Sequence, residues 1–219
     1  METELGSGFN GQVYLLQPEG KEKRKAKAVK VSSNESLLHE LKISLLWPLN
    51  TVGLMIRPKA HLTTEIGEML IMHKYDSPLN KIYMTLSSEQ KLEALYQVSF
   101  GLAMLHSLKI THGDIKIENI LYDKLKNRYD LSDFEYSRVN NEEERKYDIK
   151  CLMSVIHSIL FGSSQTYETS NLKYYQDTLL KIGYSPIVID LILDILMQDN
   201  YSAAEICRQC CIALEKFKN

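Results

Sequence analysis

Four polar side chains are spaced in a way that suits the transfer of a phosphoryl group. Asp114, in the segment His-Gly-Asp-Ile-Lys-Ile-Glu-Asn, can accept or orient the proton of an attacking hydroxyl. Lys116 can offset charge on the transferred group, and Asn119 can offer its amide oxygen to magnesium. Asp133 follows an apolar stretch in Leu-Ser-Asp-Phe-Glu and would be the second metal ligand. One aspartate and one asparagine suit Mg²⁺, which takes few carboxylates and adds phosphate oxygens.

A glycine-rich segment near the N-terminus could close over phosphate groups. Residues 6–13 have the sequence Gly-Ser-Gly-Phe-Asn-Gly-Gln-Val, the pattern G-x-G-x-x-G-x-V. Glycines in such a loop let backbone amides approach phosphate oxygens without obstruction by side chains. A dinucleotide-binding loop shares the spacing but opens a helix, whereas these glycines connect two strand-like stretches. We therefore expect the loop residues Gly6, Ser7, Gly8 and Gly11 to close over phosphate groups, with Val13 at the start of the second strand.

Lys30 lies in the apolar strand Ala-Val-Lys, where an ammonium group is costly unless an anion pairs with it. A phosphate together with the carboxylate of Glu40 would satisfy this charge. Glu40 follows in the next predicted helix, ten positions later (40 − 30), whereas Glu35 lies too early to reach. The alternative is an edge-strand lysine that faces water, and it would be the default if no other motif matched.

The elements that must position these side chains begin with strands. Gln12–Gln17 and Lys25–Ser32 flank a polar turn, which predicts an antiparallel hairpin. Ser36–Trp47 has apolar residues at helical spacing and is closed by Pro48, which predicts a helix. Met69–Lys74 is the last of the strand-like stretches that follow.

The rest of the chain has a helical pattern. The expected helices cover Ser88–Leu108, Cys151–Phe161, Ile187–Met197 and Ala203–Phe217. A strand-rich front followed by a helix-rich back indicates an α+β protein with two lobes rather than an alternating parallel sheet. We place the boundary near Asp76–Pro78, so that residues 1–76 and 77–219 form two lobes of one domain.

The composition excludes several classes of function. The 219 residues are 44% hydrophobic and 25% charged, which is ordinary for a soluble globular protein. A formal net charge of −2 argues against a nucleic-acid partner. No apolar run approaches the roughly 18 residues that span a bilayer, and the N-terminus is unlike a secretory signal. The four cysteines suit a reducing cytoplasm, and Cys207, Cys210 and Cys211 favour a helix face over a zinc site.

The order of the motifs resembles that of the eukaryotic-type protein kinases: GSGFNGQV, AVK, HELK, HGDIKIEN and DFE. The resemblance runs from Leu5 to about Glu205. It implies a bilobal protein-kinase-like fold, with a strand-rich N-lobe, a helical C-lobe, and ATP and Mg²⁺ as cofactors. It further implies transfer of the γ-phosphate of ATP to a hydroxyl on a protein, of the serine/threonine type because of Lys116.

The resemblance also assigns residues around the adenine of ATP. They are Val13 and Ala28 as its roof, Leu121 as its floor, Met72 as the gatekeeper, and His73 and Tyr75 of the hinge. Each of these side chains would equally suit plain core packing.

The chain departs from the family in a consistent way. Gly113 stands where the family has an arginine that pairs with a phosphorylated activation loop. Only 15 positions (148 − 133) separate Asp133 from Asp148, which resembles the aspartate that anchors the catalytic loop. The activation loop, its Ala-Pro-Glu sequence and the late-helix arginine that pairs with that glutamate are all missing. Glu135 replaces the glycine of the Asp-Phe-Gly motif.

These losses predict a minimal, monomeric kinase without activation-loop control, unless a partner surface stands in for the loop. Because the missing segment normally supports a linear peptide, we expect recognition of a folded protein surface. His-Gly-Asp with Asp-Phe-Glu-Tyr is also similar to aminoglycoside and choline kinases, which keeps a small-molecule substrate as an alternative. A pseudokinase binding module is another. Minimal kinases of this kind resemble effectors that bacterial pathogens or large viruses make to act in the host cytosol.

Overall fold

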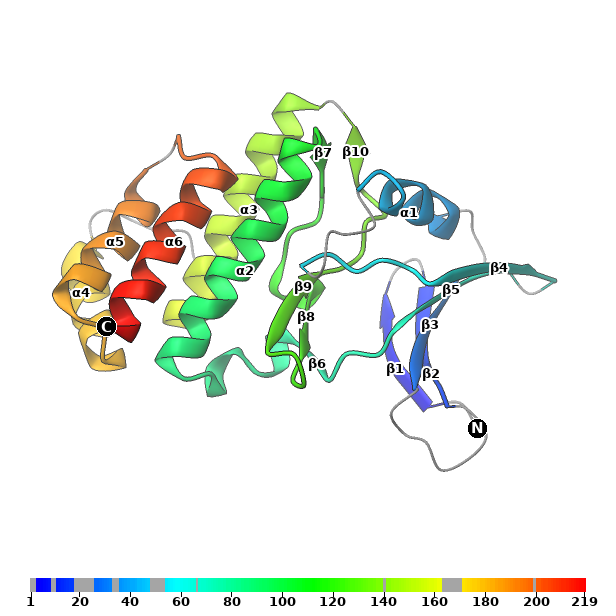
Figure 1. Cartoon of the computed structure of the whole chain (residues 1–219), viewed down its shortest axis with the longest axis horizontal. Coiled ribbons are helices and arrows are strands. Elements are labelled where there is room, and N and C mark those ends of the chain that lie inside the picture. Colours follow the sequence, from blue (N-terminus) through cyan, green and yellow to red (C-terminus); the bar gives the residue numbers. More distant parts are fainter. Residues whose placement is uncertain are drawn as a thin grey trace.

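The computed structural model describes residues 3–8, 11–17, 26–32, 36–47, 54–65, 67–139, 141–162, 171–198 and 200–219. Most strands gather at one end of the molecule and the long helices at the other, with short strands between them (Figure 1). The predicted α+β architecture, with a strand-rich lobe and a helical lobe, is confirmed.

The strand-rich lobe is one antiparallel sheet in the order β1-β2-β3-β5-β4. Its strands are β1 (Thr3–Gly8), β2 (Gly11–Leu16), β3 (Lys27–Ser32), β4 (Ala60–Thr64) and β5 (Gly67–His73). The predicted hairpin pairing is present, since Val13 of β2 lies opposite Lys30 of β3. Residues 18–25, which include the expected turn, lie outside the described ranges.

Helix α1 (Ser36–Ser44) packs against β3 and β5 of this sheet. Leu37 of the helix and Leu70 of β5 are both fully buried. Lys30 lies directly opposite Leu70, and opposed residues of antiparallel strands point to the same side. The helix therefore covers the face of the sheet that carries Lys30.

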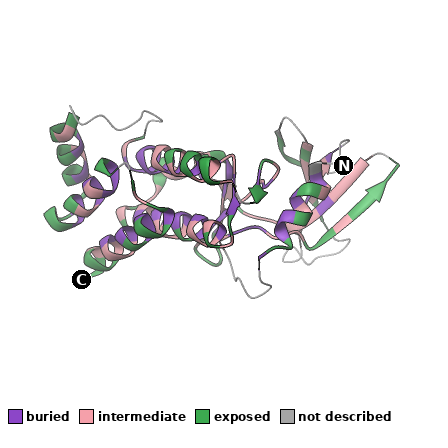
Figure 2. Cartoon of the chain, turned by 90° about the horizontal axis from the view of Figure 1, so that it is seen from above, coloured by how far each residue is buried: buried purple, intermediate pink, exposed green. Residues whose placement is uncertain are grey.

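The helical lobe consists of α2 (Ser88–Ser107), α3 (Glu142–Phe161), α4 (Leu172–Ile182), α5 (Pro186–Met197) and α6 (Ala203–Lys218). These helices turn their buried residues toward one another (Figure 2). Ser87 with Gln90 and Ser202 with Glu205 form capping boxes that begin α2 and α6. Within the described ranges, no helix is both long enough and apolar enough to cross a membrane.

Two small sheets at the junction of the lobes position the polar motifs. One contains β6 (Ser77–Pro78), β8 (Ile120–Asp123) and β9 (Arg128–Leu131), and the other pairs β7 (Ile110–Thr111) with β10 (Arg138–Val139). Short 3₁₀ turns cover Leu79–Lys81, Tyr83–Thr85 and Ile117–Asn119. Ile120 lies opposite Leu131, so the residue before β8 and the residue after β9, Asn119 and Ser132, are neighbours.

Helix α3 is longer than the sequence predicts. It begins at Glu142 rather than at Cys151, because the Asn141 side chain accepts a hydrogen bond from the Glu144 backbone and caps it. The first turns are mostly charged and exposed, so they carry no apolar stripe that would reveal a helix. Asp148 therefore lies inside the helix.

Two other predictions are corrected by the structure. Helix α1 ends at Ser44, three residues before the expected Trp47, whose ring packs against Phe134 with centroids 4.9 Å apart. Helix α4 is not predicted at all, because Tyr175 and Leu179 are its only buried residues and such a short stripe is a weak signal. The remaining expected elements agree with the observed ones to within two residues at each end.

Candidate active site

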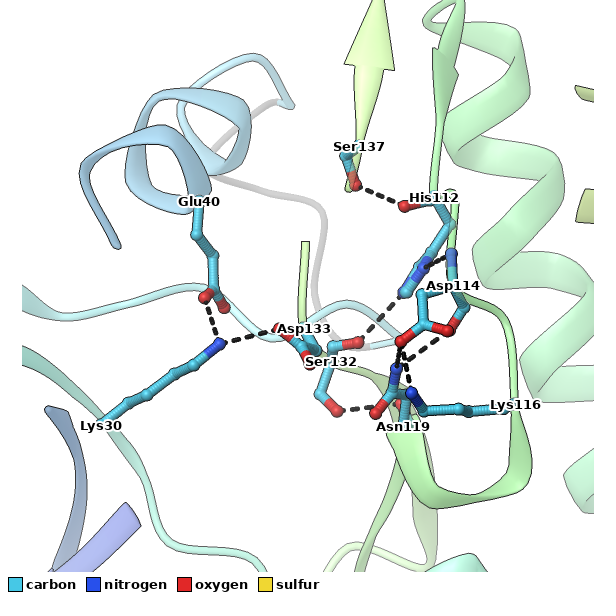
Figure 3. Close-up of polar contacts among 9 residues, drawn as sticks. All are labelled: Lys30, Glu40, His112, Asp114, Lys116, Asn119, Ser132, Asp133 and Ser137. Atoms are coloured by element: carbon cyan, nitrogen blue, oxygen red, sulfur yellow. Dashed lines mark hydrogen bonds and ion pairs between the residues drawn. The ribbon is translucent and has the colours of Figure 1, made fainter. Parts of the chain in front are cut away.

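Side chains from both lobes meet in one polar cluster (Figure 3). Lys30 Nζ lies 2.8 Å from Glu40 Oε2 of α1 and 2.7 Å from Asp133 Oδ1. The Glu40 side chain is almost completely buried, and the backbone N–H of Phe134 favours the ionised form of its carboxylate. The predicted contact between Lys30 and Glu40 is present. Sequence reasoning missed that Asp133 joins the same ammonium group.

The neighbouring charges of this cluster shift the pKa values of its members. Burial by itself lowers the pKa of Lys30, but the attraction of Glu40 and Asp133 outweighs it and raises that pKa above its usual value. Lys30 therefore stays positively charged at any cellular pH. Burial raises the pKa of Glu40, although the nearby Lys30 opposes this shift. Two carboxyl groups face a single ammonium group, an arrangement that favours a further cation beside Asp133.

The catalytic-loop residues form a second cluster around Asp114. Lys116 Nζ lies 2.5 Å from Asp114 Oδ2, and Asn119 Nδ2 donates to the same oxygen at 2.8 Å. Asn119 Nδ2 also donates to the backbone oxygen of Asp114 at 2.9 Å. Ser132, next to Asp133, donates to the Asn119 backbone oxygen through both its N–H and its Oγ, each at 2.9 Å. The two clusters are thus directly connected.

His112 is fully buried behind Asp114, and its bonds define its tautomer. Its Nε2 lies 3.0 Å from the backbone oxygen of Ser132, so Nε2 must donate. Its Nδ1 accepts from the Asp114 backbone N–H at 3.3 Å. Burial lowers the pKa of His112 despite the nearby carboxylates, which agrees with this neutral form. The ring holds the backbone of Asp114 against the strand that leads to Asp133.

Asp148 of α3 fixes the start of the same loop. Its carboxylate accepts from the backbone N–H groups of His112 at 2.8 Å and Gly113 at 2.9 Å. His106 Nε2 lies 3.0 Å from it as well. The carboxylate is completely buried, so these three partners replace the water that it loses on folding. The expected anchoring contact of Asp148 is present.

Comparison with known proteins identifies the architecture that this site belongs to. A family model described as the protein kinase domain matches residues 1–158, which is most of the chain. The chain belongs to the protein kinase family. The match ends inside α3 of the helical lobe, so α4, α5 and α6 lie beyond it.

Serine/threonine-protein kinases are among the similar curated proteins. A serine/threonine-protein kinase/receptor of Acanthamoeba polyphaga mimivirus is 29% identical over 167 residues, which are 71% of this chain and 10% of that protein. A kinase of Dictyostelium discoideum is 39% identical over 42% of this chain and 6% of its own length. Testis-specific serine/threonine-protein kinase 4 of Homo sapiens is 33% identical over 43% of this chain and 28% of its own length. This chain therefore spans only a small part of these relatives.

Among solved structures, the crystal structure of Rad53 in complex with AMP-PNP has the same fold. It aligns with a TM-score of 0.70 at 19% identity, over 95% of this chain and 63% of that one. At this level of identity the likeness supports the kinase fold alone.

The oxygen atoms near Asp133 fit the Mg²⁺ that the kinase family implies. Because Nδ2 of Asn119 is engaged by Asp114, Oδ1 is the atom of that amide that can ligate a cation. Asp133 has a φ of +67°, an unusual conformation that a non-glycine residue keeps only where its surroundings enforce it. Within the described ranges, no group of three or more His, Cys, Asp or Glu side chains could hold a metal unaided. Such a pair suits an ion that is also bound by phosphate oxygens.

The glycine-rich loop of this kinase joins β1 to β2. Gly8 lies opposite Gly11 and Gly6 opposite Val13, while residues 9 and 10 at the tip lie outside the described ranges. A Cβ atom at Gly11 would come within 2.7 Å of the backbone oxygen of Val31, so only glycine permits this approach of β2 to β3. Gly6 has open space beside it and carries no such constraint.

Three of the residues expected around adenine share one face of the sheet. Ala28 lies opposite Met72, and Val13 lies opposite Lys30. Since Ala28 and Lys30 are two residues apart, the side chains of Val13, Ala28 and Met72 point to the same side of the sheet as Lys30. Leu121 belongs to the other lobe, in β8, where it is half-buried and lies opposite Asp130.

The hinge is held by side chains that sequence reasoning missed. His73 Nε2 lies 2.9 Å from Asp123 Oδ2, and Tyr75 donates through its hydroxyl to Asp130. Asp130 is completely buried and also accepts from Arg128 and from the Leu54 backbone. The Tyr75 hydroxyl therefore anchors the segment between the two lobes. Acidic residues inside otherwise apolar strands, as in Ile-Leu-Tyr-Asp and Arg-Tyr-Asp-Leu, are the signal that could have found this network.

Proposed function

We propose that this chain is an ATP-dependent serine/threonine-protein kinase that transfers the γ-phosphate of ATP to a hydroxyl group on a protein. One observation carries the proposal. A continuous set of contacts runs from Lys30 through Asp133 and Ser132 to Asn119 and Asp114. Phosphoryl transfer depends mainly on positioning and charge stabilisation, and in the kinase family these are the groups that supply both.

In this proposal each side chain has a separate task. Asp114 orients the acceptor hydroxyl and takes its proton. Lys116, which contacts Asp114 while half exposed, offsets charge on the transferred group. Lys30, held by Glu40, contacts the phosphates of ATP. Asn119 and Asp133 would hold Mg²⁺, which supplies neutralisation of phosphate charge when bound.

The nucleotide would lie between the lobes that we assign to residues 1–76 and 77–219. We propose that it contacts Gly6, Ser7, Gly8, Gly11, Val13, Ala28, Lys30, Met72, His73, Tyr75 and Leu121. For His73 and Tyr75 the contacts would come from the backbone, because the side chains bond to Asp123 and Asp130.

The direct test is transfer of labelled phosphate from ATP with Mg²⁺ to mixed acceptor proteins, followed by acid hydrolysis to identify the phosphorylated amino acid. Phosphoserine or phosphothreonine is expected. Nucleotide binding in a thermal-shift assay without any transfer would favour a pseudokinase. Label in a small molecule alone would favour the aminoglycoside or choline type, although all of the similar curated proteins named above are serine/threonine-protein kinases.

Replacement of Lys30 by methionine should reduce phosphoryl transfer by about 100-fold or more, since the phosphates lose their positioning cation. Glu40→Gln should cost less, because glutamine can still accept a hydrogen bond from Lys30. Initial rates at saturating ATP, with melting temperatures of both variants, measure the effect. Full activity of a folded Lys30→Met variant would remove Lys30 from the mechanism.

We also propose that activity does not depend on phosphorylation of the chain. Only residues 134–141 separate Asp133 from α3, and β10 within them pairs with β7. This short connection stands in place of the activation segment, so phosphorylation has no activation loop on which to act. A linear peptide substrate normally lies on the activation segment. Without that segment, we expect the enzyme to recognise a folded protein surface.

Phosphatase treatment should therefore leave the activity within about twofold of the untreated enzyme, and short generic peptides should be poor substrates beside intact proteins. Rates on a peptide library and on folded acceptors, before and after treatment, decide both points. Strong phosphatase sensitivity would contradict the first half, unless a bound partner stands in for the loop. Efficient turnover of short peptides would contradict the second.

The setting in which the kinase acts is also a proposal. We propose a cytoplasmic, monomeric effector enzyme, in the host cytosol if the chain comes from a virus or a pathogen. The relative from a giant virus supports this. Light scattering of the purified chain and localisation of a tagged copy in host cells would test it.

A further inference from the structure

Ser137 links the segment after Asp133 to the catalytic loop. It is completely buried, and its Oγ donates to the backbone oxygen of His112 at 2.9 Å (Figure 3). Its backbone N–H donates to the Phe134 oxygen at 3.2 Å, which closes a turn over residues 134–137. The turn is therefore attached to the residue that lies two positions before Asp114.

The same serine is also bonded to the other lobe. His39 of α1 lies 2.9 Å from the backbone oxygen of Ser137 through Nε2, and because a carbonyl only accepts, His39 donates. His39 precedes Glu40 and is exposed, so its ring reaches out from the helix to this contact. One residue thus accepts a hydrogen bond from the strand-rich lobe and donates one to the helical lobe.

The segment that ends at Ser137 also contains the residues that contact Lys30 and Glu40. Phe134 packs its ring against His112, with centroids 5.0 Å apart, and its backbone N–H favours the ionised form of Glu40. Asp133 bonds to Lys30. A shift of the turn relative to α1 would therefore move Asp133, Phe134 and Glu40 together.

A side chain at position 113 would prevent this arrangement. Gly113 has a φ of +82°, and a Cβ there would lie 2.5 Å from the backbone oxygen of Tyr136. The turn occupies the space beside the loop in which the arginine of other family members would begin. At this position the chain has close packing of Gly113 against the Tyr136 backbone, where other family members have a charged arginine.

We propose that His39 and Ser137 are positioning residues, and that the bonds His39–Ser137–His112, here called the serine bridge, hold α1 against the catalytic loop. The serine bridge does with hydrogen bonds to backbone carbonyl oxygens what a phosphorylated loop and its arginine do elsewhere in the family. The inference rests on the proposed function and deepens it, because it explains how the active arrangement forms without a modification.

The expected effect of breaking the bridge is a shift in population. A single hydrogen bond of this kind changes an equilibrium by about 3- to 10-fold. If ATP and Mg²⁺ bind only the arrangement with Lys30, Glu40 and Asp133 joined, and this arrangement is the minor one before nucleotide binds, KM for ATP rises by that factor. Saturating ATP restores the arrangement, so kcat changes by less than about twofold. A purely structural loss would instead reduce kcat and the melting temperature.

The test compares His39→Ala with His39→Gln, in which the amide can still donate to the Ser137 oxygen. His39→Ala should raise KM for ATP by about 3- to 10-fold, and His39→Gln should stay near the wild type. Lys42→Ala, an exposed change on the same helix, is the matched control. Ser137→Ala, which removes the bond to His112, should act in the same direction as His39→Ala.

A second measurement does not need catalysis. Amide hydrogen exchange in residues 37–44 and 133–137 should become faster together in His39→Ala, and remain slow in His39→Gln and Lys42→Ala. This readout holds even if the chain transfers no phosphate, so failure of the proposed function and failure of the bridge are distinguishable. Unchanged exchange in both segments overturns the inference. Equal defects in His39→Ala and His39→Gln overturn it as well, since the hydrogen bond would not be the cause.

Discussion

Asp133→Asn is expected to reduce phosphoryl transfer by at least about 100-fold while leaving the protein folded. Asparagine has nearly the same shape, and the Asp133 side chain is one-third exposed, so packing changes little. The variant loses the negative charge that faces Lys30 at 2.7 Å and that would hold Mg²⁺. Both contacts act on the phosphates, so the loss should persist at saturating ATP.

The measurement is the initial rate of label transfer at several Mg²⁺ concentrations, with the melting temperature of each variant. Glu118→Gln is the matched control, because it makes the same chemical change at an exposed position of the catalytic loop. It should retain most of the activity. An Asp133→Asn variant as active as this control would show that Asp133 is not the metal ligand.

Gly113→Arg restores the arginine that the family has at this position. We expect this variant to lose stability and activity rather than to become controlled by phosphorylation. The backbone at Gly113 has a φ of +82°, and even the Cβ of alanine would meet the Tyr136 oxygen at 2.5 Å. The strain costs about 1–3 kcal/mol, and the clash displaces the turn that follows Asp133. We expect lower stability together with an activity loss of about tenfold or more.

Gly183→Ala separates these two effects. Gly183 also has a positive φ, +98°, but it lies at the end of α4, and a Cβ there would have nothing within 4 Å. It should lose stability of a similar order through backbone strain and keep its kcat. Chemical denaturation and initial rates of Gly113→Ala, Gly113→Arg and Gly183→Ala test this. A stable, fully active Gly113→Arg variant would contradict the role given to Gly113.

The sequence predicts most of what depends on short-range patterns. The loop from His112 to Asn119 and the segment at Asp133 carry their chemistry in consecutive residues, so they can be read directly. The Lys30–Glu40 contact is predictable because a lysine in an apolar strand needs an anion nearby. Apart from the start of α3 and the end of α1, the strands and helices expected from apolar patterns are likewise placed to within two residues.

What the sequence does not predict depends on contacts between distant segments. His39 and Ser137 are 98 positions apart, and neither belongs to a motif. Tyr75 and Asp130 are 55 positions apart and meet only once the lobes are joined. The charged first half of α3 is helical because of its cap and its neighbours rather than because of an apolar stripe. For His39–Ser137 and Tyr75–Asp130 tertiary packing decides what local propensity leaves open, whereas the start of α3 depends on a local cap.

The most direct test of the central claim is transfer from labelled ATP by the wild-type chain beside Asp114→Asn, with ATP affinity measured for both. Asp114 contacts Lys116 and Asn119, and we assign it to the acceptor hydroxyl rather than to the nucleotide. The account predicts labelled serine or threonine with the wild type, a loss of about 100-fold or more with Asp114→Asn, and similar ATP affinity in both. Equal transfer by the two proteins, or none by the wild type despite tight binding of ATP and Mg²⁺, would contradict it.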